Sequence, residues 1–108
     1  MNYIILLLSS VFAALGQLFF KLGSTVSPLS MIFSVKIWIG LILYGAGTLL
    51  WIYVLSKEPL SKVYPFTALT FILVFFLSYF ILNEAISLVQ IIGVIIILVG
   101  FMVLALAS

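Results

Sequence analysis

Gln17 and Lys21, four positions apart, are the residues of this chain whose types and spacing most suggest chemistry. A spacing of four places both side chains on one face of a helix. A lysine ammonium can hold a phosphate through charge-assisted hydrogen bonds, and an amide can both donate and accept a hydrogen bond. The apolar stretch that contains the pair has no carboxylate. It therefore offers an anion-binding group without an acidic partner.

The depth of this pair leaves two interpretations open. If a helix begins at Tyr3, Lys21 lies roughly 27 Å along it, against a hydrocarbon core of about 30 Å, and so reaches the far interface. Gln17 lies one turn deeper, where an unpaired amide costs on the order of a few kcal/mol, and we expect it to have a partner. Either the pair binds substrate, or Lys21 only snorkels to the interface and Gln17 bonds a facing helix.

The composition identifies the elements that must position this pair. Hydrophobic residues make up 68% of the 108 residues and charged residues only 6%, which is typical of an integral membrane protein. Four apolar stretches are long enough to span a bilayer. We predict an all-α, polytopic membrane protein, a single transmembrane domain over 1–108 with helices at about 3–21, 37–56, 63–82 and 86–107.

The connections between these stretches are short, which favours a compact up-down bundle of four helices. Ser61, shortly after Pro59, is placed to cap the third helix. Ser87 and Gln90 have the spacing of a capping box for the fourth. Pro65 lies early enough in the third helix to be tolerated there or to bend its first turns.

The residues that are missing narrow the chemistry. The chain has no cysteine, histidine, arginine or aspartate. This excludes zinc and haem sites, disulfide bonds and catalytic triads. Its two carboxylates, Glu58 and Glu84, fall in connections rather than in apolar stretches. We therefore expect a protein that is not an enzyme and uses no cofactor, metal or nucleic acid.

Small residues recur at helical spacing and predict close helix packing, because they let backbones approach in lipid. In the first helix, one stripe of such residues lies beside the stripe that carries Gln17 and Lys21. In the fourth helix two glycines stand seven positions apart on one face. The predicted packing residues are Ser9, Ala13, Gly16, Gly40, Gly47, Gly93 and Gly100.

Three aromatic residues are candidates for a substrate path. Tyr44 and Trp51 alternate with glycines along the second helix and present rings with polar tips. Tyr64 precedes Pro65 at the start of the third helix and could offer a hydrogen bond. Phe71, deeper in that helix, could line an acyl-chain path, but facing lipid is the simpler expectation. The same residues could serve packing alone.

The lysines do not decide the orientation of the chain. Lys57 and Lys62 lie on the side of the termini, and Lys21 and Lys36 lie on the opposite side, so the positive-inside rule gives a tie. Either the first helix sets the orientation, or the chain inserts both ways and works as an antiparallel pair.

Several short motifs along the chain carry a resemblance to a known family. They are Gly16-Gln17 with Lys21, Trp51 before Pro59-Leu60-Ser61, Tyr64-Pro65, and Asn83-Glu84 followed by Gln90, Gly93 and Gly100. The chain resembles the small four-helix branch of the drug/metabolite transporter superfamily over its whole length. Within that branch it is most similar to the EamA-like paired subunits proposed to flip undecaprenyl-phosphate-linked aminoarabinose.

This resemblance implies a multi-pass protein of the bacterial inner membrane that moves a polyprenyl-phosphate-linked sugar or a related anionic lipid. It implies a dimer, either of identical chains, which could be antiparallel, or with a related four-helix subunit. In this interpretation Lys21 meets the phosphate of the lipid. The remaining predicted substrate-binding residues are Gln17, Tyr44, Trp51 and Tyr64.

Two other functions stay open. The sister branch, the small multidrug exporters, carries a membrane glutamate at the position that Ala13 occupies here, and alanine can bind neither proton nor cationic drug. Such an exporter would need its proton-coupling carboxylate at another position, for which Glu84 is the candidate. If the chain is not such an exporter, we expect Glu84 to have a structural role. Alternatively, the chain is an assembly subunit that transports nothing, and its polar residues serve packing.

Overall fold

The computed structural model describes residues 3–24 and 28–107, and in that part of the chain the ordered elements are all helices. They are α1 (Tyr3–Gly23), α2 (Pro28–Ile32), α3 (Val35–Leu55), α4 (Leu60–Val63), the 3-10 helix η1 (Tyr64–Phe66), α5 (Thr67–Phe80) and α6 (Leu88–Ala107). Four helical segments of 20 or 21 residues are long and apolar enough to cross a membrane; α4, η1 and α5 together make the third. The predicted all-α fold with four membrane spans is confirmed. Residues 25–27 of the first connection lie outside the described part.

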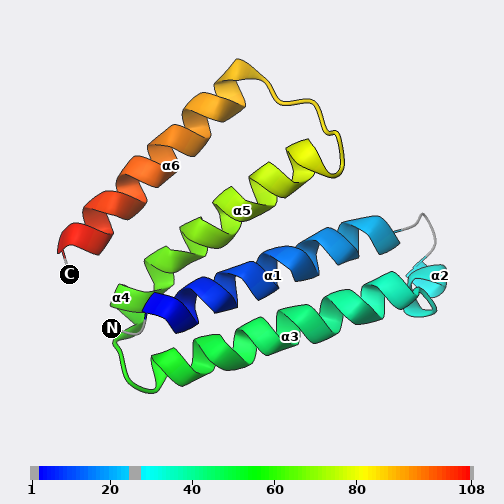
Figure 1. Cartoon of the computed structure of the whole chain (residues 1–108), viewed down its shortest axis with the longest axis horizontal. Coiled ribbons are helices and arrows are strands. Elements are labelled where there is room, and N and C mark those ends of the chain that lie inside the picture. Colours follow the sequence, from blue (N-terminus) through cyan, green and yellow to red (C-terminus); the bar gives the residue numbers. More distant parts are fainter. Residues whose placement is uncertain (1–2, 25–27, 108) are drawn as a thin grey trace.

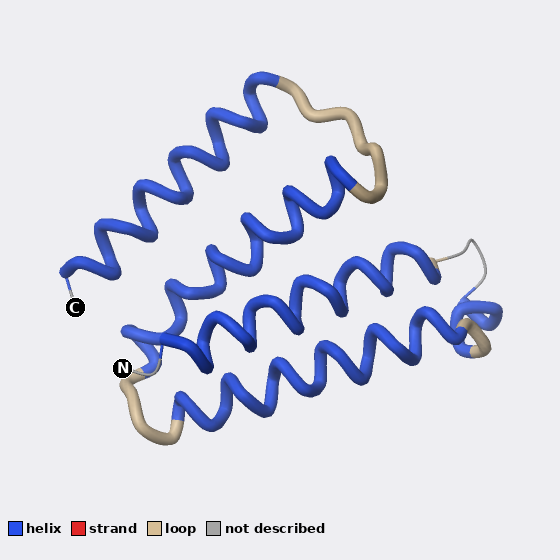
Figure 2. Tube along the Cα trace, in the orientation of Figure 1, coloured by secondary structure: helices blue, strands red, loops and turns tan. Residues whose placement is uncertain are grey.

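The four spans lie side by side in the order α3, α1, α5, α6 (Figures 1 and 2). The molecule measures 45 × 37 × 19 Å, so this row of helices is flat. The central position of α1 follows from its two stripes of small residues. One stripe packs on α3 and the other turns toward α5, where Ala14 and Leu18 share a cavity with Val74 and Leu77.

The backbones of α1 and α3 approach so closely that glycine is required on both sides. A Cβ atom on Gly16 would lie 2.9 Å from the carbonyl oxygen of Gly40, and a Cβ on Gly47 would lie 2.9 Å from the carbonyl oxygen of Ser9. The Ser9 hydroxyl donates a 2.8 Å hydrogen bond to the Gly47 carbonyl across the same seam. Ala13 packs here as well, with its backbone nitrogen 3.1 Å from a Cβ on Gly47. This seam fixes the register of the two helices.

The two glycines of α6 behave differently. A Cβ added to Gly93 or to Gly100 would meet nothing within 4 Å. Neither glycine therefore packs against another helix of the single chain, so the packing role predicted for both stays a prediction about association with a second chain. α6 makes an aromatic contact with the start of the third span, where Phe101 meets Phe66 with ring centroids 5.1 Å apart. No residue of α6 is fully buried, so the three other spans build the interior.

The third span starts irregularly, as Pro65 predicted. η1 separates α4 from α5, and the Thr67 hydroxyl donates a 2.9 Å hydrogen bond to the Tyr64 carbonyl. The cap predicted at Ser61 is wrong. Pro59 holds the N-cap position with extended backbone (φ −61°, ψ 144°), so the helix starts directly after it and Ser61 lies inside α4.

The connection between α5 and α6 is longer than expected from the sequence, because α5 ends at Phe80 and α6 begins at Leu88. Within it Asn83 adopts a left-handed conformation (φ 54°), which asparagine tolerates better than most residues. The capping box at its end is confirmed: the Gln90 side chain accepts from the Ser87 N–H at 2.8 Å, and the Gln90 N–H donates to the Ser87 hydroxyl at 3.2 Å.

Candidate functional site

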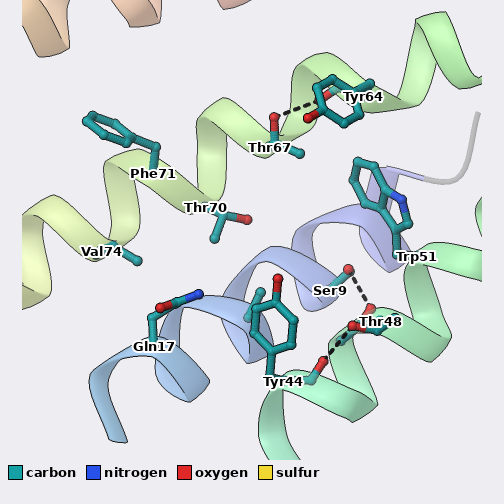
Figure 3. Close-up of a pocket in the computed structure, with 12 residues that line it drawn as sticks. Ser9, Gln17, Tyr44, Thr48, Trp51, Tyr64, Thr67, Thr70, Phe71 and Val74 are labelled. Atoms are coloured by element: carbon teal, nitrogen blue, oxygen red, sulfur yellow. Dashed lines mark hydrogen bonds between the residues drawn. The ribbon is translucent and has the colours of Figure 1, made fainter. Parts of the chain in front are cut away.

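A groove of about 660 Å³ runs above α1, with α3 along one side and η1 and α5 along the other (Figure 3). Each helix contributes side chains at intervals of three or four residues, so one face of each helix makes one wall. The lining residues are Ser9, Ala13, Gln17, Tyr44, Gly47, Thr48, Trp51, Tyr64, Thr67, Thr70, Phe71 and Val74. The groove is open along part of its length, because Tyr44, Tyr64 and Phe71 are 41%, 61% and 49% exposed.

The lining of the groove is largely apolar, with hydroxyl groups and one amide distributed along it, and it carries no carboxylate or ammonium group. The hydroxyl protons of Ser9, Thr48 and Thr67 are used in hydrogen bonds of 2.8 to 2.9 Å to backbone carbonyls. Their oxygens remain able to accept. The hydroxyls of Tyr44 and Tyr64, by contrast, make no hydrogen bond within the described residues and are available to a ligand.

Gln17 makes no bond to a facing helix within the described part of the chain, which was one of the two alternatives left open by the sequence. The side chain is exposed, and among the described residues it has no hydrogen-bond partner. Its amide extends into the groove rather than bonding a facing helix (Figure 3). The expected partner is missing because the groove keeps α5 away from this face of α1. The amide therefore retains its full hydrogen-bonding capacity.

Aromatic contacts hold three of the rings that line the groove. Trp51 and Tyr64 meet edge to face across the groove, with centroids 6.5 Å apart. Tyr44 leans on Phe20 of α1 at 6.0 Å. Edge-to-face and tilted pairs of this kind add roughly 0.5 to 1.5 kcal/mol beyond their buried area. The rings thus present defined faces to whatever occupies the groove.

A second cavity of about 230 Å³ adjoins the groove toward the Lys21 end of α1. It is lined by Ala14, Gln17, Leu18, Lys21, Val74, Leu77, Ser78, Leu82 and Glu84. Gln17 lines both cavities and so stands between them. Lys21 belongs to the small cavity and not to the groove.

The structure thus brings four of the five predicted substrate-binding residues, Gln17, Tyr44, Trp51 and Tyr64, to one groove. Sequence reasoning missed Thr48, Thr67, Thr70 and Val74. A signal for three of these was present, since Tyr64 is followed by Thr67, Thr70 and Val74 at spacings of three, three and four. Phe71, expected in lipid, lines the groove as well.

Comparison with known proteins identifies the family. The model of the EamA-like transporter family matches residues 34–106, which is more than half of the chain. The chain belongs to the EamA-like transporter family. This EamA-like chain is a multi-pass membrane protein of a transporter family, and its four spans fit that assignment.

Curated relatives support the assignment over nearly the whole length of the EamA-like chain. It is 35% identical to a probable 4-amino-4-deoxy-L-arabinose-phosphoundecaprenol flippase subunit ArnE of Erwinia tasmaniensis, over 93% of each chain. Proteins of the same name from an Enterobacter species and from Hamiltonella defensa are 32% and 35% identical, each over 96% of both chains. No solved structure matches.

The groove of this EamA-like chain offers no carboxylate to a cation. Ala13 lies in its wall, so the position at which the multidrug exporters carry a glutamate offers no charge here. An organic cation that entered the groove would meet hydroxyls, an amide and ring faces, without a carboxylate to offset the cost of its charge in the membrane.

Proposed function

We propose that this chain is a flippase subunit that moves a polyprenyl-phosphate-linked sugar across the bacterial inner membrane. The observation that carries the proposal is an uncharged, hydroxyl- and aromatic-lined groove that adjoins a cavity with a lysine. The names of the relatives support it, since they describe an aminoarabinose joined through phosphate to undecaprenol.

The chemistry of the groove suits a sugar. Sugar hydroxyls need hydrogen-bond partners when they leave water, and Gln17, Tyr44 and Tyr64 can supply them without a charge at membrane depth. The faces of Tyr44, Trp51 and Tyr64 give apolar surface with a polar edge. The open side lets the long hydrocarbon tail remain in lipid while only the head group passes through the groove.

Lys21 has a different task in this proposal. It stands in the last turn of α1, at the interface end, where an ammonium can be hydrated and yet reach an anion. There it would recruit the phosphate by charge-assisted hydrogen bonds. Gln17, shared by the two cavities, then offers the first hydrogen bond to the sugar as the head group moves from the small cavity into the groove.

We propose a dimer as the working unit. A groove that is open on one side is incomplete as a passage, and a second four-helix bundle would close it. The partner is either a second copy, which the two-to-two lysine tie allows to be antiparallel, or a related four-helix subunit. The word "subunit" in the names of the relatives favours a partner of some kind.

The proposal is tested by binding of farnesyl phosphate esterified with L-arabinose to the full chain in nanodiscs. Lys21→Ala should weaken binding on the order of tenfold or more, because a hydrogen bond to a charged group contributes about 1.5 to 3 kcal/mol. Lys21→Arg should retain part of the affinity. Lys36→Ala is the matched control, since Lys36 lies in the first turn of α3 at the same end but lines neither cavity.

Melting of each variant separates binding from folding. Lys21 is exposed, so its truncation should leave the melting temperature unchanged. If Lys21→Ala binds this lipid as tightly as the unchanged chain, the phosphate role is wrong and Lys21 only snorkels.

A further inference from the structure

Two oppositely charged side chains line the small cavity. Lys21 and Glu84 both line it, one from the last turn of α1 and the other from the connection between α5 and α6. Both side chains are exposed, and within the described part of the chain they form no ion pair with each other. Gln17 and Ser78 are the other polar residues of the lining.

Backbone hydrogen bonds hold both charged residues in place. The Glu84 N–H donates a 3.0 Å hydrogen bond to the Ser78 carbonyl, directly after the left-handed residue Asn83. The Lys21 carbonyl accepts from the hydroxyl of Ser24 at 2.7 Å and from its N–H at 3.3 Å. The connection therefore turns back so that a carboxylate faces the cavity of the only lysine in α1.

A carboxylate in this place is hard to explain for a purely anionic ligand, because it would oppose the attraction of Lys21 for phosphate. A ligand with a positive as well as a negative group would satisfy both side chains and leave no charge uncompensated. The lipid in the names of the relatives has both, a phosphate and a 4-amino group.

We propose that the small cavity is a recognition site for a dipolar head group, in which Lys21 binds the phosphate and Glu84 binds the ammonium of an amino sugar. This inference rests on the proposed flippase function and adds a specificity determinant to it. Glu84 then distinguishes amino sugars from plain sugars at the entrance, before the neutral groove, which cannot make that distinction by charge.

The test compares two probe lipids that differ in one group: farnesyl phosphate esterified with 4-amino-4-deoxy-L-arabinose and the same lipid with L-arabinose. Dissociation constants are measured near neutral pH for the full chain in nanodiscs. The unchanged chain should bind the amino lipid roughly tenfold or more tightly, as expected for one charge-assisted hydrogen bond. Glu84→Gln should remove that preference while binding of the arabinose lipid stays equal or becomes slightly tighter. Lys21→Ala should weaken binding of both lipids.

Glu58→Gln is the matched control, because Glu58 follows α3 at the opposite end of the bundle and lines neither cavity. It should leave the preference intact. Equal binding of both lipids by the unchanged chain would overturn the inference and leave the flippase proposal standing. A Glu84→Gln variant that loses affinity for both lipids equally would also overturn it, since Glu84 would then only shape the connection. If the unchanged chain binds neither lipid, the proposed function fails together with the inference.

Discussion

The close packing of α1 and α3 allows a direct test by stability measurements. In α3, Gly47 lies at the contact with α1, and Gly45, two residues away, lies outside it. Gly47→Ala places a Cβ atom 2.9 Å from the Ser9 carbonyl oxygen and 3.1 Å from the Ala13 nitrogen. Both are backbone atoms, so α1 itself must retreat. Overpacking of this kind costs about 1 to 3 kcal/mol. The retreat also strains the Ser9 to Gly47 hydrogen bond, and such bonds between membrane helices contribute on the order of 0.6 to 1.7 kcal/mol.

Gly45→Ala is the control that isolates this cost. Gly45 lies two residues away in the same helix, and a Cβ there meets nothing within 4 Å. Both substitutions gain helix propensity, about 1 kcal/mol in a helix interior, and this gain cancels in the comparison. The difference in unfolding free energy between the two variants should therefore be the overpacking cost, about 1 to 3 kcal/mol, plus any weakening of the Ser9 to Gly47 hydrogen bond.

The assay is unfolding of the detergent-solubilised chain, by heat or by a denaturing detergent, followed by loss of helical signal. Gly47→Ala should unfold several degrees below Gly45→Ala, since about 1 kcal/mol shifts the midpoint of a domain near this size by roughly 4 to 8 °C. Equal midpoints for the two variants would refute the close approach of α1 and α3. They would also refute the position of the groove, since both helices line it.

Two further predictions concern Gln17 and the orientation of the chain. Gln17→Leu should lower lipid translocation without lowering the melting temperature, because the amide has no hydrogen-bond partner among the described residues; a clear loss of thermal stability would show that it has one. Since Lys57 and Lys62 balance Lys21 and Lys36, two lysines added near the C-terminus should fix the termini in the cytoplasm. Reporter fusions at the C-terminus would show on which side of the membrane it lies. If the unchanged chain already has its C-terminus on one side only, that result would count against dual insertion.

The sequence was most informative where a structural rule depends on neighbouring residues. The four spans follow from runs of apolar residues, and the capping box follows from the identities of Ser87 and Gln90 at a fixed spacing. The α1 to α3 seam could also be predicted, because small residues at helical spacing in both helices favour close packing in lipid.

The candidate site was harder to predict from the sequence, because it depends on how the helices are rotated and how far apart they lie. For Gln17 the sequence left two alternatives, a bond to a facing helix or a place in a substrate path, and only the helix arrangement shows that its side chain lines a groove. Lys21 and Glu84 line the same cavity because the chain turns at Asn83. The path of a connection of seven residues cannot be predicted from residue spacing.

The division between a charged cavity and a neutral groove has a consequence for transport. A head group that stayed bound to Lys21 through strong charge-assisted hydrogen bonds would be held at one interface, and tight binding there would slow its passage. The groove residues Gln17, Tyr44 and Tyr64 offer only neutral hydrogen bonds, which are about half as strong. They can replace lost hydration without trapping the sugar. In the proposed mechanism, the charged residues at the end of the bundle would therefore set specificity, and the weak, uncharged contacts along the groove would allow movement.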